Sequence, residues 1–340
     1  MPRTRRKHNT RLFTLHSVKG GVGKTSLALA IASWCASHFK EETHLVDADM
    51  TGTNILDCFF PEENLLAELY LNDFLLATPD RYLGFLGRKN TALTQTEFVN
   101  VPDGPKGLKI FPSRSDLDSI RKIVPFLSQE WHLHFFQERL SDLVHALDGT
   151  FPNIIIDFPP GLFGFSLAGF KVGQDILRKM EKEVESDGRT TVLPILVSSG
   201  DSVDYCSAIP MLDGILSEID SGKEKLGKQV RIVFNRFVFP KGQSKDPVNE
   251  MARIVKILKT RGKSNDFGID LIEKGAKSGE TRATILPRID DFMMHDVPRI
   301  MNDICSKKNN QRETGDPRNK LKLAPAMEEW VLEVKKWLPE

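Results

Sequence analysis

The sequence has few cysteines, few tyrosines and no long apolar run. Its four cysteines lie far apart and form no C-x-x-C pair, which argues against a zinc or iron–sulfur site and against a disulfide framework. No apolar run approaches the roughly 20 residues that span a bilayer, and the basic N-terminus lacks the apolar core of a signal peptide. A net charge of +1 identifies no partner by itself. These absences lead us to expect a cytoplasmic globular protein without stable membrane insertion.

Short apolar runs alternate with longer, helix-like stretches along the chain. In chain order the runs are LFTLHSV, THLVDAD, GLKIFPS, NIIIDFPPG, TTVLPILVSS, QVRIVFNRF and ATILPRI. Apolar strands separated by helical stretches predict an α/β fold with a mostly parallel, doubly wound sheet and helices on both faces. Ligands of such sheets bind beyond the carboxyl ends of the strands, where polar residues gather in this sequence.

The pattern also divides the chain into parts. We expect a basic tail over 1–11, one domain over 12–305 with a helical excursion at about 60–107, a polar linker over 306–325, and an amphipathic helix over 326–340. Acidic residues outnumber lysines in this last helix, so anionic lipid would repel it. Docking onto the body of the protein, docking onto a partner and plain core packing all stay open for it.

The segment KGGVGKT has the composition of a phosphate-binding loop between a strand and a helix. Gly20, Gly21 and Gly23 allow backbone N–H groups to converge on phosphate oxygens. The helix that follows directs its positive end to the same place. Lys24 can neutralise the β- and γ-phosphates, and the Thr25 hydroxyl can ligate Mg²⁺. The segment therefore predicts a P-loop NTPase with ATP and Mg²⁺ as cofactors.

The loop departs from the usual pattern at its first position. That pattern begins with glycine, but Val18 stands there and a second lysine, Lys19, follows it. In this form the loop resembles the deviant Walker A motif of the ParA/MinD-type P-loop ATPases. The resemblance implies that Lys19 is a signature lysine, which reaches across an ATP-dependent homodimer to the phosphates bound by the partner.

Two later segments fit the same family in the same order. VDADMTGTN resembles its D-x-D-x-x-G segment, which implies that Asp49 positions the attacking water and that Asp47 supports the metal site. IIIDFPPG resembles its Walker B and switch II segment, which implies that Asp157 holds Mg²⁺ and that Gly161 senses the γ-phosphate. Without the loop, the acid pair after the strand would be interpreted as a helix N-cap.

Two strand ends complete the resemblance. VFNRF implies that Asn235 contacts adenine, although a lone Asn at a strand end is usually structural. ILPRIDD resembles the loop that closes over the base. The nucleotide-binding residues implied in this way are Gly20, Gly21, Val22, Gly23, Lys24, Thr25, Ser26, Asn235, Arg236, Pro287 and Arg288. The implied catalytic residues are Lys19, Lys24 and Asp49, and the implied metal residues are Thr25, Asp47 and Asp157.

The resemblance covers roughly residues 10–300 and implies a slow ATPase that acts as a dimerising switch. Residues 221–282 hold 15 Lys/Arg against 7 Asp/Glu, which suits a DNA backbone, with a solvated charged face as the alternative. The first hypothesis is a ParA-like partition or positioning ATPase that binds DNA non-specifically, with a stimulating protein partner and association with the nucleoid. The second is a regulatory or assembly subunit that acts on a protein partner without DNA.

Overall fold

The computed structural model describes most of the chain. The described residues are 9–51, 55–60, 70–78, 98–101, 104–114, 116–127, 132–147, 152–182, 190–219, 226–238, 246–260, 267–278, 282–288, 294–306, 330 and 334. The basic residues before position 9 and the predicted linker after Ser306 lie outside these ranges. Only two residues of the predicted C-terminal helix, Trp330 and Val334, are described, and both are helical and buried.

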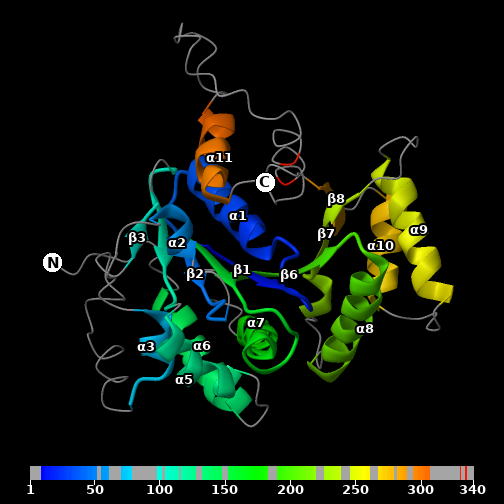
Figure 1. The fold of residues 1–340 in the computed structure, drawn as a ribbon. Coiled ribbons are helices and arrows are strands. Elements are labelled where there is room, and N and C mark those ends of the chain that lie inside the picture. The colour runs from blue at the N-terminus through cyan, green and yellow to red at the C-terminus, as the bar shows by residue number, and fades with distance from the viewer. Residues whose placement is uncertain are drawn as a thin grey trace, which may run out of the picture.

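An eight-stranded sheet forms the centre of the molecule (Figure 1). The strands lie in the order β3-β4-β2-β5-β1-β6-β7-β8. The edge strand β3 pairs antiparallel with β4, and every other neighbouring pair is parallel. The strand bounds are β1 Thr10–His16, β2 Thr43–Asp47, β3 Val99–Asn100, β4 Leu108–Phe111, β5 Asn153–Asp157, β6 Thr190–Ser199, β7 Arg231–Phe237 and β8 Ala283–Pro287.

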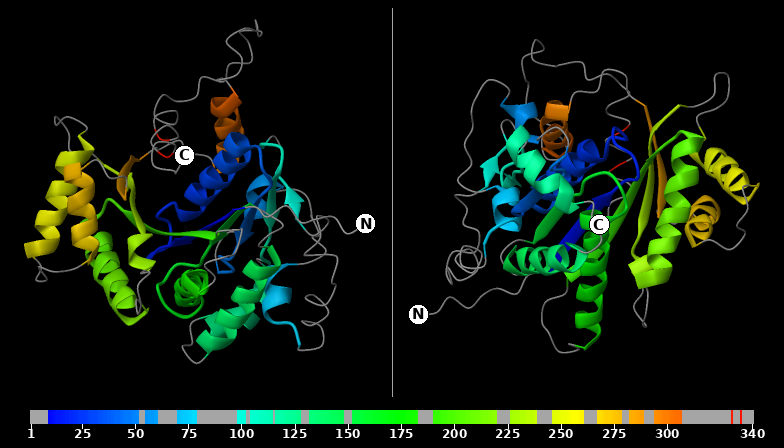
Figure 2. Two further views of the ribbon diagram at one scale, coloured as in Figure 1. Left: turned by 180° about the vertical axis from the view of Figure 1, so that it is seen from behind. Right: turned by 60° about the horizontal axis from the view of Figure 1, so that its bottom comes forward.

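Helices cover both faces of this sheet (Figures 1 and 2). The α-helix bounds are α1 Lys24–Phe39, α2 Ile55–Phe59, α3 Leu71–Leu75, α5 Leu117–Leu127, α6 Leu133–Leu147, α7 Gly164–Lys182, α8 Ser202–Ile219, α9 Pro247–Thr260, α10 Phe267–Ser278 and α11 Val297–Ser306. Two short 3-10 helices, η2 Leu226–Lys228 and η3 Met294–Asp296, lie between them. Helices α1 and α11 pack together on one face, α6 and α7 on the other, and α9 and α10 pack beside β8.

The strands are apolar on both faces because both faces are covered. In β5, Ile154 and Ile156 belong to the core under α6 and α7, whereas Ile155 belongs to the core under α1 and α11. This alternation lets one continuous apolar run supply two cores. The predicted fold class, a mostly parallel sheet with helices on both faces, is therefore confirmed.

All seven predicted strands are present, and the sheet contains one further strand, β3. Strand β1 begins at Thr10, so Arg11 of the predicted tail is part of the sheet and pairs with Glu41 at 3.1 Å. Strand β3 was not predicted. Helix α3 and strand β3 lie within the predicted excursion, most of which falls outside the described residues, and the domain division stays a prediction. Within the described part of the chain, none of the helices is long and apolar enough to cross a bilayer.

Candidate functional site

The glycine-rich loop links β1 to α1 and depends on backbone that only glycine adopts easily. Gly21 and Gly23 have φ angles of 73° and 83°, in the left-handed region. A Cβ atom on Gly23 would lie 2.3 Å from Nδ2 of Asn235, so two reasons require glycine there. Helix α1 begins directly afterwards at Lys24, and its N-cap residue, Gly23, has no side chain with which to cap the first turn. The first N–H groups of α1 are therefore arranged as a site for an anion.

Lys24 lies at the centre of the site, buried and paired with two carboxylates. Its Nζ lies 2.6 Å from Oδ1 of Asp157 and 3.5 Å from Oδ2 of Asp49. The Lys24 side chain is 5% exposed, that of Asp157 is fully buried and that of Asp49 is 15% exposed. Strand β5 delivers Asp157 at its carboxyl end, and the segment after β2 delivers Asp49. The lysine of the loop is thus neutralised by the acids of two neighbouring strands.

The balance of burial and charge explains how an ammonium group is kept there. Burial lowers the pKa of Lys24, but Asp157 and Asp49 outweigh this effect and hold the pKa above its ordinary value. Burial raises the pKa of Asp157, while Lys24 and a hydrogen bond with the Thr25 hydroxyl oppose the rise. The Thr25 hydroxyl and the Asp157 carboxylate, both predicted to serve Mg²⁺, therefore lie close together.

Asp47 lies deeper than the other two acids of the site. It is fully buried, and its Oδ2 accepts a hydrogen bond from the backbone N–H of Ile55 at 3.0 Å, at the first residue of α2. Burial raises the pKa of Asp47 to about 8, with Asp157 and Asp49 adding to the rise. The contact that the structure gives Asp47 is the helix-capping one, and its support of a metal stays a prediction.

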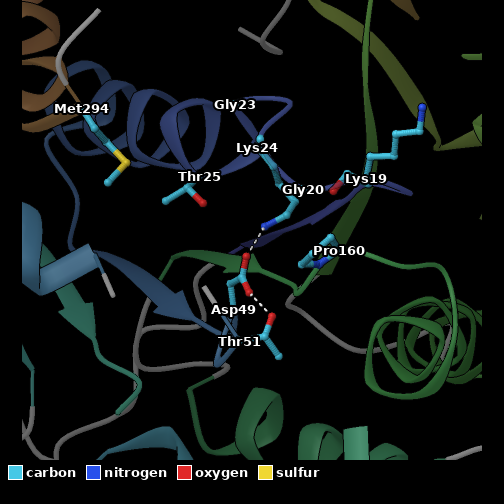
Figure 3. Close-up of a pocket in the computed structure, with 11 residues that line it drawn as sticks. Lys19, Gly20, Gly23, Lys24, Thr25, Asp49, Thr51, Pro160 and Met294 are labelled. Carbon is cyan, nitrogen blue, oxygen red and sulfur yellow. Dashed lines mark hydrogen bonds and ion pairs between the residues drawn. The ribbon is translucent and has the colours of Figure 1, made fainter. Parts of the chain in front are cut away.

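A pocket of about 480 Å³ opens in front of the loop (Figure 3). Its lining consists of Ser17, Lys19, Gly20, Gly21, Gly23, Lys24, Thr25, Asp49, Thr51, Pro160 and Met294. Asp49 reaches the pocket wall and accepts a hydrogen bond from the Thr51 hydroxyl at 2.9 Å. The side chain of Lys19 is exposed and points away from Lys24 and Asp49 (Figure 3).

The residues predicted to surround adenine lie near the carboxyl ends of β7 and β8. Asn235 is 3% exposed and donates from Nδ2 to the carbonyl oxygens of Val22, at 2.9 Å, and of Gly23, at 3.5 Å. Arg236 has a φ of 57° and donates to the carbonyl of Gly21. These contacts of Asn235 and Arg236 hold the loop, and their role toward adenine stays a prediction.

The remaining predicted residues lie at the end of β8, in the first turn of α1 and after β5. Pro287 ends β8 and Arg288 follows it, exposed. Ser26 lies in the first turn of α1. The backbone N–H of Gly161 donates to the carbonyl of Ser17 at 2.8 Å, and Gly161 has a φ of 100°. This contact ties the predicted switch segment to the start of the loop.

Sequence reasoning missed several residues of the site. Pro160 lies in the segment IIIDFPPG and Thr51 in VDADMTGTN, but the resemblance implies a role for neither residue. Met294 of η3 and Trp330, whose Nε1 donates to Oδ1 of Asn235 at 3.2 Å, come from distant parts of the chain. No local pattern marks these last two residues, because only the tertiary fold brings them to the loop.

Comparison with known proteins gives the fold a precedent. No protein-family model matches this chain, and no curated protein matches its sequence. Among solved structures, a ParA family ATPase from Chlorobium tepidum TLS is 16% identical, with a TM-score of 0.52 over 95% of this chain and 99% of that one. Apo McdA from Cyanothece is 14% identical, with a TM-score of 0.55 over 97% of this chain and 100% of that one. Such identities establish the fold alone: the chain has the fold of the ParA-type P-loop ATPases.

Proposed function

We propose that this protein is a Mg²⁺-dependent ATPase that works as an ATP-driven dimerising switch of the ParA-like positioning type. The observation that carries the proposal is Lys24, held between Asp157 and Asp49 at the first residue of α1. The pocket in front of it is lined by the glycines of the loop. A cation at a helix N-terminus beside open backbone N–H groups suits a polyphosphate.

Two oxygen ligands suited to a divalent cation lie close together beside Lys24. Thr25 and Asp157 would hold Mg²⁺, which supplies positive charge to the β- and γ-phosphates when bound. Lys24 would direct its ammonium group to the phosphate oxygens. Asp157 and Asp49 keep Lys24 in the charged form that this contact requires.

Asp49 is the carboxylate best placed to orient the attacking water. It lies on the pocket wall and is partly exposed, whereas Asp157 and Asp47 are fully buried. The hydrogen bond from Thr51 fixes one of its oxygens, and the departure of Lys24 toward phosphate would leave the other for water. Phosphoryl transfer needs such positioning more than a strong base.

The exposure of Lys19 supports a role toward a second subunit. Its side chain leaves the pocket for solvent (Figure 3), and Lys24 already occupies the position next to its own phosphate site. In an ATP-bound dimer Lys19 would face the nucleotide of the partner and neutralise transition-state charge as an arginine finger does. Turnover is then slow in the monomer and coupled to association.

Nucleotide binding tests the first part of the proposal. Titration of ATP with Mg²⁺ should show saturable binding by the wild type and nearly none by Lys24→Ala, because the variant lacks the cation of the phosphate site. Lys122→Ala, which removes an exposed lysine of α5, is the matched control and should bind like the wild type. Equal binding by Lys24→Ala and the wild type would show that the loop does not hold the phosphates.

Light scattering tests the dimer. In the Asp49→Ala background, a slowly hydrolysed ATP analogue should increase the mass to that of a dimer, and adding Lys19→Ala should abolish the increase while ATP still binds. Lys122→Ala in the same background is the control. A Lys19→Ala, Asp49→Ala double variant that dimerises normally would make Lys19 an ordinary loop lysine.

Non-specific DNA binding is the proposed output of the switch. Arg253, Lys256 and Lys259 are exposed on α9, although Arg253 pairs with Glu250 at 2.8 Å and Lys259 pairs with Glu273. Arg261, which belongs to the same predicted stretch, lies outside the described residues.

Charge reversal tests this output. Reversal at Arg253, Lys256 and Lys259 should weaken ATP-dependent DNA binding at low salt, and high salt should weaken it further. Reversal at Arg121 and Lys122, two exposed residues of α5, is the control. The DNA role is refuted if the wild type with ATP binds no DNA even at low salt.

Exposed apolar side chains favour a protein partner as the alternative output. Phe163, two residues beyond the predicted switch segment, is 49% exposed, and Leu117 of α5 is 60% exposed. Exposed apolar residues suit a protein contact better than a DNA backbone. If DNA binding fails, a stimulating protein that loses its effect on ATP turnover with Phe163→Ser would establish this alternative.

A further inference from the structure

One contact connects the C-terminal part of the chain to the phosphate-binding loop. The indole Nε1 of Trp330 donates to Oδ1 of Asn235 at 3.2 Å. Trp330 is 2% exposed, and Val334, one helical turn further, is fully buried. Both belong to the apolar core that α1 and α11 share. The contact therefore lies in a dry environment, where a polar group without a partner is costly.

The carboxamide of Asn235 is engaged at both ends. Its oxygen accepts from Trp330, while its Nδ2 donates to the carbonyls of Val22 and Gly23 in the loop. One end thus fixes the orientation of the amide and the other end fixes the loop. This arrangement forms a relay of hydrogen bonds from Trp330, through Asn235, to the backbone that begins α1.

The last step of the relay, from Asn235 to the loop, is a close contact between side chain and backbone. A Cβ atom on Gly23 would lie 2.3 Å from Nδ2 of Asn235, so the Asn235 side chain is packed directly against the loop. Gly23 has a φ of 83° and precedes Lys24, the cation of the phosphate site. A rotation of the Asn235 amide therefore displaces the part of the loop that sets the direction of its N–H groups.

We propose that Trp330 is a positioning residue of the nucleotide site, which holds the loop in its phosphate-binding conformation through Asn235. The inference rests on the proposed function, because it assigns to the loop the binding of nucleotide. It adds a part of the chain that no motif of the loop includes. Because coupling between two sites is reciprocal, nucleotide in the pocket strengthens the contact of Trp330 with Asn235.

Replacement of Trp330 by phenylalanine isolates the hydrogen bond. Phenylalanine keeps an aromatic ring in the core but lacks the N–H, so the buried oxygen of Asn235 loses this donor. The amide then gains by turning its oxygen toward another donor, which withdraws Nδ2 from Val22 and Gly23. We expect Trp330→Phe to weaken the binding of ATP with Mg²⁺ by about fivefold, the loss of one ordinary hydrogen bond.

Trp34 offers a matched control. It is 2% exposed and belongs to the same apolar core, and its Nε1 has no hydrogen-bond partner among the residues that the structure describes. It lies ten residues beyond Lys24 along α1, or about 15 Å. Trp34→Phe makes the same chemical change without breaking the relay, and calorimetric titration should show an affinity within about twofold of the wild type.

The indole N–H itself supplies a second readout. The four tryptophans of the chain give four indole cross-peaks in a spectrum of ¹⁵N-tryptophan-labelled protein, and the Phe variants identify those of Trp330 and Trp34. Addition of ATP with Mg²⁺ should shift the Trp330 cross-peak and protect its hydrogen from exchange, while the Trp34 cross-peak stays in place. A purely structural Trp330 would show no response to nucleotide.

The outcomes separate this inference from the proposed function. If the wild type binds no nucleotide, the proposed function itself is wrong. If the wild type binds but Trp330→Phe binds equally well, or the Trp330 cross-peak does not respond, the relay is refuted alone. Tighter binding by Trp330→Phe would also refute it, since Trp330 would then oppose nucleotide instead of supporting the loop.

Discussion

The pair of Lys24 and Asp157 should contribute strongly to the stability of the ligand-free protein. Their charged atoms lie 2.6 Å apart, with side chains 5% and 0% exposed. At an effective dielectric constant of about 20 this attraction is on the order of 6 kcal/mol, and desolvation of the ions takes back part of it. Removal of one partner leaves the other as an unpaired buried charge, which costs about 3–5 kcal/mol.

Lys24→Met removes the ammonium group and keeps much of the side-chain volume. We expect it to lower the free energy of unfolding by about 3–5 kcal/mol near neutral pH, measured by urea denaturation without nucleotide or metal. Asp157→Asn should also destabilise the protein. The double variant should cost less than the sum of the two single changes, because it contains neither unpaired charge. Lys122→Met, at an exposed position, should change stability by no more than about 0.5 kcal/mol.

The stability lost in Lys24→Met should depend on pH in a defined direction. Burial raises the pKa of Asp157, and Lys24 opposes the rise, so Lys24→Met raises the pKa further. A carboxyl with a raised folded pKa loses stability as pH rises above its unfolded pKa of about 3.9. The deficit of Lys24→Met should therefore grow toward neutral pH, once the pH exceeds the raised pKa that Asp157 has in the wild type. Strictly additive single and double variants, or a deficit independent of pH, would refute the ion pair.

Three further predictions concern other parts of the site and core. Burial lowers the pKa of His44 to about 3, so the free energy of unfolding should fall as the pH drops below about 6.5. Between about pH 7.5 and about pH 5 the wild type should lose about 2 kcal/mol more than His44→Phe, measured by thermal unfolding. Equal losses in the two proteins would contradict this. Gly23→Ala should lower the free energy of unfolding by at least about 1–3 kcal/mol, because the added Cβ atom would meet Asn235. Gly20→Ala should leave it nearly unchanged in the same denaturation assay, because the nearest atom to its added Cβ lies 3.9 Å away. Equal losses would contradict the loop geometry. Asp49→Ala should bind ATP but hydrolyse it at least about tenfold more slowly in a phosphate-release assay, and normal turnover would place the water elsewhere.

The strands and the loop could be predicted because each carries a local signal. Ile154, Ile155 and Ile156 form an unbroken apolar run, which is typical of a strand covered on both faces. The glycines and Lys24 have a spacing that the chemistry of phosphate binding requires. Strand β3 was not predicted because two residues, Val99–Asn100, are too few to show the alternation of apolar and polar residues that indicates a strand.

The contacts within the site could not be predicted in the same way. The motif assigns Lys24 to phosphates, but in the ligand-free protein a buried ammonium group needs countercharge, and Asp157 and Asp49 provide it. Asp47 belongs to the same D-x-D pair as Asp49, yet it is buried and accepts a hydrogen bond from the first residue of α2. The bond of Trp330 to Asn235 spans 95 residues, a separation over which no sequence pattern extends.

The position of β1 in the sheet has a consequence for how the protein is made. β1 carries the loop, but it pairs with β5 and β6, so that Arg11 lies opposite Asn153 and Thr10 lies opposite Thr190. A nascent chain grows by about 5–20 residues per second, so the first strand waits for many seconds before its neighbours leave the ribosome. Parallel pairings over such separations also form slowly. The loop therefore gains the support of its complete sheet late in synthesis, once Thr190–Ser199 of β6 has been made.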